Sequence, residues 1–204
     1  MQTKSTNVRL LLKAATQSLH EILDSHSLLA PLATKKLQRD DYELALRVLA
    51  GWLIPTEKSL AGWESNVPEL MLPERRKAHL IEHDLRELGV SKDRLQLCPQ
   101  VPRISSPEEV YGILYVTEGA TLGGSVLSRS IEAALGSTVS IRYFQSYGSQ
   151  TGYFWQSFLE RLEEAPSRGL SIAQMASAAQ ASFRSLCDWL NEYEYSDEIP
   201  DLIR

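Results

Sequence analysis

The chain has 204 residues, of which 43% are apolar and 23% are charged, and its formal net charge is −5. This composition is that of a globular protein, and it excludes the disordered class. The acidic balance gives no reason to expect nucleic acid as a partner. No stretch reaches the apolar length that a bilayer requires, and the leucine run near the start is too short for a signal peptide. We therefore expect a cytoplasmic protein with no membrane and no nucleic-acid partner.

Apolar residues recur with helical spacing along the first half of the chain. The pattern predicts helices over residues 5–29, 40–64 and 73–88. Pro55 is expected to kink or interrupt the second of these helices, because proline lacks the backbone N–H that a helix interior uses. The charge-rich residues 74–87, ERRKAHLIEHDLRE, are interpreted as a solvated face.

The second half contains the clearest helix signal in the sequence. Ser106, Pro107 and Glu109 form a capping box with proline at the first helical position. The helix that they open is predicted to run to Leu135 and to end at Gly136. Two further helices are expected over residues 149–164 and, after a second capping box, over about 171–195.

The remaining signals favour a single all-helical unit. Residues 139–144, VSIRYF, are the one candidate for a short strand. The chain has no repeats, no low-complexity tracts and no linker long enough to divide domains. The two cysteines, Cys98 and Cys187, form no CxxC motif and are expected to be reduced thiols, with a disulfide as the alternative. We predict an all-α fold, a single-domain helical bundle that covers residues 1–204.

Glycine is unusually frequent inside the long central helix, at Gly112, Gly119, Gly123 and Gly124. Each internal glycine costs a helix roughly 0.5–1 kcal/mol relative to alanine, so this density needs a compensating reason. Gly119 and Gly123 share one face of the helix, and Tyr115 lies one turn further back on it. Either a closely packed helix or a flat ligand against bare backbone would explain the strip. The additional Gly124 favours a helix that bends.

A second candidate site lies on the first predicted helix. Arg9, Lys13, Thr16 and His20 fall on one stripe of that helix. An imidazole can bind iron through one nitrogen, and the two cations can meet carboxylates at the edge of an anionic cofactor. The alternative is a solvated helix face that carries a surface histidine.

Taken together, these two segments resemble the haem oxygenase family. Residues 12–20, LKAATQSLH, match the LK-x-AT-x-x-x-H signature around the family's proximal histidine. Residues 112–124, GILYVTEGATLGG, are similar to the bacterial form of its distal helix. Weaker similarities lie at residues 83–89, at Tyr147-Gly148, Trp155 and Phe158, and at Phe183 and Trp189. The resemblance is closest to bacterial members, including those associated with bacterial phytochromes.

The resemblance implies an enzyme that uses haem b as both cofactor and substrate. With O₂ and electrons from an external donor, it would open the ring to biliverdin, carbon monoxide and ferrous iron. The haem would be sandwiched between the proximal first helix, with His20 as the metal ligand, and the kinked glycine-rich helix. There Gly119 and Gly123 would be the catalytic positions, because their backbone would steer oxygen onto a ring carbon. The other haem-contacting residues would be Arg9, Lys13, Thr16, Tyr115 and Gly124.

The resemblance also implies partners and leaves some details open. A reductase or ferredoxin would supply electrons, a bacterial phytochrome could accept the product, and the protein would be a monomer. Ala120 stands where animal members carry an aspartate, and Gln156 stands where many bacterial members carry a basic residue. The biliverdin isomer is therefore not fixed by the sequence.

Three other functions remain as alternatives. A haem carrier or sensor would keep the same fold and ligand but would not turn haem over. A helical partner-binding module would bind no haem at all. Residues 79–83, HLIEH, also match the inverted zinc-peptidase motif H-x-x-E-H, although the sequence offers no clear third zinc ligand.

Overall fold

The structure is a computed structural model that describes residues 7–197, with side chains described for residues 7–193. Every regular element in this described part is helical, which confirms the predicted all-α class for these residues. The α-helices are α1 Val8–Asp24, α2 Arg39–Ala61, α3 Ala78–Glu87, α4 Pro107–Leu135, α5 Arg142–Gln145, α6 Thr151–Glu164 and α7 Ile172–Asp197. Short 3₁₀ turns lie at Ala30–Ala33, Pro68–Leu70, Pro73–Arg75, Lys92–Arg94, Gly136–Thr138, Gly148–Gln150 and Ala165–Arg168.

Helix α4 begins and ends where the sequence predicts. The Ser106 backbone N–H donates to the Glu109 carboxylate at 3.1 Å, which is the reciprocal bond of a capping box. At the other end Gly136 has a φ of 66°, a left-handed conformation that glycine adopts without strain. Between these ends the helix is continuous through all four of its glycines. The bend predicted near Gly124 stays a prediction.

Helix α2 runs without interruption through Pro55, so an interruption there is wrong, and the kink stays a prediction. Proline at position 55 cannot donate to the carbonyl of Gly51, one turn earlier in the helix. That carbonyl accepts a hydrogen bond at 2.9 Å from the backbone N–H of Cys98, which lies far away in the sequence. The loop around Cys98 therefore replaces the bond that the proline removes.

Two other expectations from the sequence, a short strand and an unbroken helix, are also wrong. Residues 139–144 form no strand, because the last three of them belong to the short helix α5. The buried carboxylate of Asp84 caps this helix by accepting from the N–H groups of Arg142 at 3.1 Å and Tyr143 at 2.8 Å. The helix predicted over residues 73–88 is divided into a 3₁₀ turn and α3, because the chain buries Arg75 and Lys77 where the two meet.

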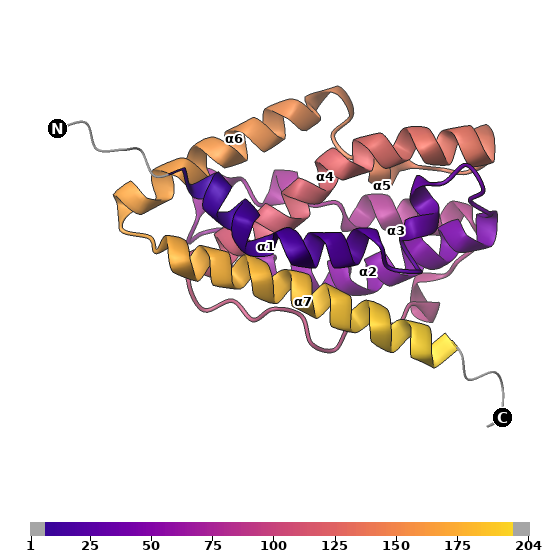
Figure 1. The fold of residues 1–204 in the computed structure, drawn as a ribbon, viewed down its shortest axis with the longest axis horizontal. Helices are drawn as coiled ribbons and strands as arrows, with labels where there is room; N and C mark the ends of the chain where they lie inside the picture. The colour runs from indigo at the N-terminus through magenta and orange to yellow at the C-terminus, as the bar shows by residue number, and fades with distance from the viewer. Residues whose placement is uncertain (1–6, 198–204) are drawn as a thin grey trace.

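Helix α4 lies inside the bundle, between α7 on one side and α5 and α6 on the other. Helix α1 lies along α7, as Figure 1 shows. The close approach of α4 and α7 depends on Gly112. A Cβ at this position would lie 2.5 Å from the Ala178 Cβ and 2.6 Å from the Met175 carbonyl oxygen. Close helix packing therefore explains Gly112.

Gly112→Ala is expected to destabilise the fold by about 1–3 kcal/mol, because the added methyl group overpacks the α4–α7 contact. Chemical denaturation of the purified variant measures this cost. Gly62→Ala is the matched control, since a Cβ there would meet its nearest neighbour, the Ser59 carbonyl oxygen, at an ordinary 3.6 Å. Equal unfolding midpoints for the two variants would contradict the close packing at Gly112.

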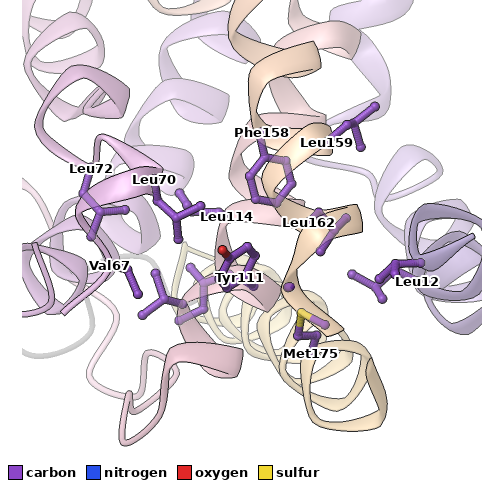
Figure 2. Close-up of a cluster of buried hydrophobic side chains, with 14 of the residues drawn as sticks. Leu12, Val67, Leu70, Leu72, Tyr111, Leu114, Phe158, Leu159, Leu162 and Met175 are labelled. Carbon is purple, nitrogen blue, oxygen red and sulfur yellow. The ribbon is translucent and has the colours of Figure 1, made fainter. Parts of the chain in front are cut away.

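A buried apolar cluster fixes α1, α4, α6 and α7 relative to one another (Figure 2). Tyr111 and Phe158 lie at its centre with their ring centroids 6.4 Å apart. Leu12 joins it from α1 and Met175 from α7. This packing holds the first halves of α1 and α4 in place. The second halves of the two helices are therefore fixed in position relative to each other.

The structure also bears on two further expectations, the state of the cysteines and the absence of a membrane-spanning helix. Cys98 and Cys187 are both free and buried, which confirms the expected thiols. None of the helices described here is long and apolar enough to cross a membrane.

Candidate functional site

A cavity of about 450 Å³ opens among α1, α4, α5, α7 and the segment after α1. Its size falls in the range of small-molecule and cofactor sites, roughly 300–1,000 Å³. Helix α1 contributes His20 to the lining, and α4 contributes Gly119, Ala120, Gly123 and Gly124. Most of the other lining residues are apolar: Leu23, Leu29, Leu32, Ala33, Leu49, Val116, Leu127, Phe144, Phe183 and Leu186.

The glycines of α4 divide into two kinds. At Gly119 and Gly123 no atom lies within 4 Å of the place that a Cβ would take, and both residues line the cavity. At Gly124 a Cβ would lie 3.1 Å from the carbonyl oxygen of Phe144, so this glycine allows α5 to approach α4. Close packing therefore explains Gly124, as it explains Gly112. For Gly119 and Gly123, packing gives no reason, and a flat ligand against bare backbone does.

His20 is presented to the cavity by α1 and held by a carboxylate on the same helix. Its Nδ1 lies 2.9 Å from Asp24 Oδ2, and its ring centroid lies 5.9 Å from that of Phe183. The side chain is 62% exposed, so the imidazole is accessible. A carboxylate on Nδ1 fixes the ring and makes Nε2 the nitrogen available to a metal. Asp24 was missed in the sequence, although a carboxylate four residues after a helical histidine was a usable signal.

Asp24→Asn tests the predicted role of His20 as a haem ligand. Haem binding is expected to weaken about tenfold, because an imidazole without its carboxylate partner is a less basic and less well oriented ligand. Optical titration with ferric haem measures the change. Asp93→Asn is the matched control, since Asp93 is exposed and lies outside the cavity. An unchanged haem affinity in the Asp24 variant would show that Asp24 does not support ligand binding by His20.

The other residues predicted on α1 lie closer to its beginning, away from the cavity lining. Arg9 and Lys13 are exposed, whereas Thr16 is buried and donates its hydroxyl to the Leu12 carbonyl at 2.8 Å. Burial raises the pKa of Tyr115, and the Thr16 hydroxyl and the Arg9 charge act in the opposite direction. Arg9, Thr16 and Tyr115 thus form a neighbouring group, and their contact with a cofactor stays a prediction.

A buried cluster of charges holds α4 directly beside Gly119. Glu118 is fully buried; its Oε2 lies 2.6 Å from Arg75 Nη1 and its Oε1 lies 2.6 Å from Lys77 Nζ. The Tyr147 hydroxyl donates to the same Oε1 at 2.8 Å. Burial and the negative charge of Glu118 raise the pKa of Tyr147, so the phenol keeps the proton that it donates.

This cluster corrects the interpretation of residues 74–87 as a solvated face. Arg75, Lys77 and Asp84 in that stretch are buried. Long basic side chains are normally exposed, and only a partner from elsewhere in the fold makes their burial favourable. Here the partner is Glu118, which the sequence places in a different helix.

Residues 79–83 do not bring metal ligands together. His79 is exposed, and His83 Nδ1 lies 3.7 Å from Asp84 Oδ1. Across the described residues, no group of three or more His, Cys, Asp or Glu side chains is arranged to hold a metal ion. The zinc alternative therefore gains no third ligand from the part of the chain that the structure covers.

Comparison with known proteins agrees with this geometry. The sequence profile described as heme oxygenase matches residues 6–192. A heme oxygenase of Xanthomonas campestris pv. campestris (strain 8004) is 30% identical over 138 residues, which are 67% of this chain and 78% of that protein.

Solved structures share the fold. Heme oxygenase-1 of Synechocystis sp. PCC6803, solved in complex with heme, has a TM-score of 0.75 at 15% identity over 94% of each chain. The heme oxygenase of Leptospira interrogans has a TM-score of 0.73 at 18% identity, over 92% of this chain and 100% of that one. The enzyme of Neisseria meningitidis has a TM-score of 0.66 at 19% identity, over 92% of each chain. By its sequence and by its fold, the chain belongs to the haem oxygenase family.

Proposed function

We propose that this protein is a haem oxygenase that binds haem b in the α1–α4 cavity and opens its ring to biliverdin, carbon monoxide and ferrous iron. One observation carries the proposal: the imidazole of His20 and the Cβ-free backbone of Gly119 and Gly123 line the same apolar cavity. Membership of the family supports it. Residues 1–204 then form a single haem oxygenase-like domain.

The residues of the cavity fit a flat, iron-containing ligand. His20 would ligate the iron through Nε2, because Asp24 engages Nδ1. Gly119 and Gly123 would let the face of the macrocycle lie against the backbone of α4, since no side chain stands there. The bound group supplies the redox-active iron and is also the substrate.

The neighbouring residues suit the polar edge of such a ligand. Arg9 and Lys13 would meet its carboxylates in water, where charge pairing is possible without desolvating the cations. Thr16 and Tyr115 would border the same edge, and Gly124 would border the ring. The apolar side chains of the lining would limit contact of the bound ligand with bulk water.

The proposed reaction needs a co-substrate, an electron donor and an acceptor for its product. O₂ is the co-substrate, and the electrons come from an external donor, a reductase or ferredoxin. The product passes to an acceptor, for which a bacterial phytochrome is one candidate. We propose that the protein acts as a cytoplasmic monomer.

A single-turnover assay tests the proposal. The purified protein is loaded with one equivalent of ferric haem, supplied with a reductant in air, and followed by absorption spectroscopy. Conversion of the haem spectrum to that of biliverdin, with release of carbon monoxide, is the expected result, and chromatography then identifies the isomer. A haem spectrum that persists through reduction and aeration would instead support a carrier or sensor.

A further inference from the structure

The polar side chains of the cavity are almost all engaged by the protein itself. Those that line it within the described structure are His20, Asp24, Lys77, Thr117, Thr121 and Tyr143. His20 and Asp24 pair with each other. The Thr121 hydroxyl donates to the Glu118 carbonyl at 2.6 Å, and the Thr117 hydroxyl lies 3.5 Å from the Leu114 carbonyl oxygen. The two threonines thus direct their protons to the backbone of their own helix.

Lys77 is also fully engaged. Its Nζ donates to Glu118 Oε1 at 2.6 Å, to the Tyr147 hydroxyl at 3.0 Å and to the Arg75 carbonyl at 3.1 Å. An ammonium group has three N–H donors, so these bonds use all of them. Lys77 therefore fixes the wall of the cavity and has no donor left for a molecule inside it.

Tyr143 differs from the other five. Across residues 7–193 its hydroxyl has no hydrogen-bonding partner, although the rest of the residue is held firmly. Its backbone N–H donates to Asp84 Oδ2 at 2.8 Å, and its ring packs edge-on against Phe144 with the centroids 5.2 Å apart. Burial and the charge of Glu57 raise the pKa of this phenol, so it remains a donor at neutral pH.

A hydroxyl donor without a protein partner at the wall of a cavity is unfavourable unless the contents of the cavity supply an acceptor. On helix α4, Gly119, Ala120 and Gly123 carry no donor side chain, and the hydroxyls of Thr117 and Thr121 are directed to backbone carbonyls of the same helix. We infer that Tyr143 is a positioning residue whose hydroxyl donates to water in the cavity and, through that water, to the small ligand on the open side of the haem iron. This inference rests on the proposed haem oxygenase function.

Tyr143→Phe tests the inference, with Tyr153→Phe as the matched control. The control removes the same hydroxyl from a side chain that is 65% exposed and lies outside the cavity. Both variants and the parent are first titrated with ferric haem to establish one haem per chain. The acid–alkaline transition of each ferric complex is then followed in the visible spectrum, and fluoride affinity is measured at fixed pH.

A donor near the distal ligand favours its anionic form. Its loss in Tyr143→Phe is therefore expected to raise the pKa of the acid–alkaline transition by about one unit and to weaken fluoride binding about tenfold. Tyr153→Phe is expected to match the parent in both. A structural role alone would change haem affinity or thermal stability without moving the transition. If Tyr143→Phe takes up haem but keeps the parent's transition and fluoride affinity, the inference is wrong while the proposed function stands. Failure of the parent to bind haem would overturn both.

Discussion

Gly119→Leu is expected to abolish haem turnover while the protein folds at least as stably as the parent. The position has open space where a side chain would begin, and that space is the cavity. A leucine would therefore occupy the place proposed for the face of the haem. In a helix interior leucine is more favourable than glycine by roughly 0.5–1 kcal/mol, so the haem-free fold gains rather than loses stability.

A variant that is more stable without haem but inactive shows that the glycine faces a ligand. Replacement of a glycine at a close helix contact would instead lower the stability of the fold. Chemical denaturation without haem measures the first effect, and haem titration followed by the turnover assay measures the second. Gly152→Leu is the matched control, because Gly152 also lies in a helix with open space around it but does not line the cavity. Parent-like turnover in Gly119→Leu would show that the backbone strip of α4 does not face the haem.

Glu118→Ala is expected to cost about 3–5 kcal/mol of unfolding free energy, because removal of one partner leaves the other buried charges uncompensated. Arg75 and Lys77 would both lose the carboxylate that makes their burial possible. Since typical domains are stable by only about 5–15 kcal/mol, this loss is a large part of the total unfolding free energy. The part of α4 next to Gly119 should loosen first.

Urea or guanidinium denaturation at neutral pH measures the loss. Glu164→Ala provides the comparison: it breaks an exposed ion pair with Arg161 three residues away on the helix surface. Exposed pairs of this kind contribute little, so its unfolding free energy should stay near that of the parent. If the two variants proved equally stable, the buried cluster would not be what fixes α4.

Signals that are local in sequence predicted the fold well. The capping box at Ser106 and the glycine at 136 defined both ends of α4 because the groups that satisfy the helix termini are close neighbours in the chain. Helical spacing also grouped the stripe on α1 and the glycine strip on α4, each on its own helix face. That His20 meets Gly119 and Gly123 was implied by the resemblance to the family, and the structure places the three residues in one cavity.

The features that were missed depend on contacts between distant segments. Pro55 is tolerated because Cys98 donates to the carbonyl that the proline leaves without a donor. Helix α5 replaces the expected strand because Asp84 caps it from α3. No local sequence pattern predicts either contact. The burial of Arg75 beside Glu118 was missed for the same reason, since the two residues lie far apart in the sequence. The sequence could not distinguish a glycine that allows close helix packing from one that lines the cavity. Gly112 and Gly119 differ only in the atoms that face them, and the atoms that face Gly112 belong to a distant segment.

The most direct measurement is an optical titration of the parent and of His20→Ala with ferric haem, each repeated with added imidazole. The account predicts one tightly bound haem per parent chain with the spectrum of a histidine-ligated iron. It predicts that His20→Ala loses that spectrum and that free imidazole restores it by entering the space left by the side chain. A His20→Ala complex with the parent's spectrum, in the absence of imidazole, would show that another residue holds the iron.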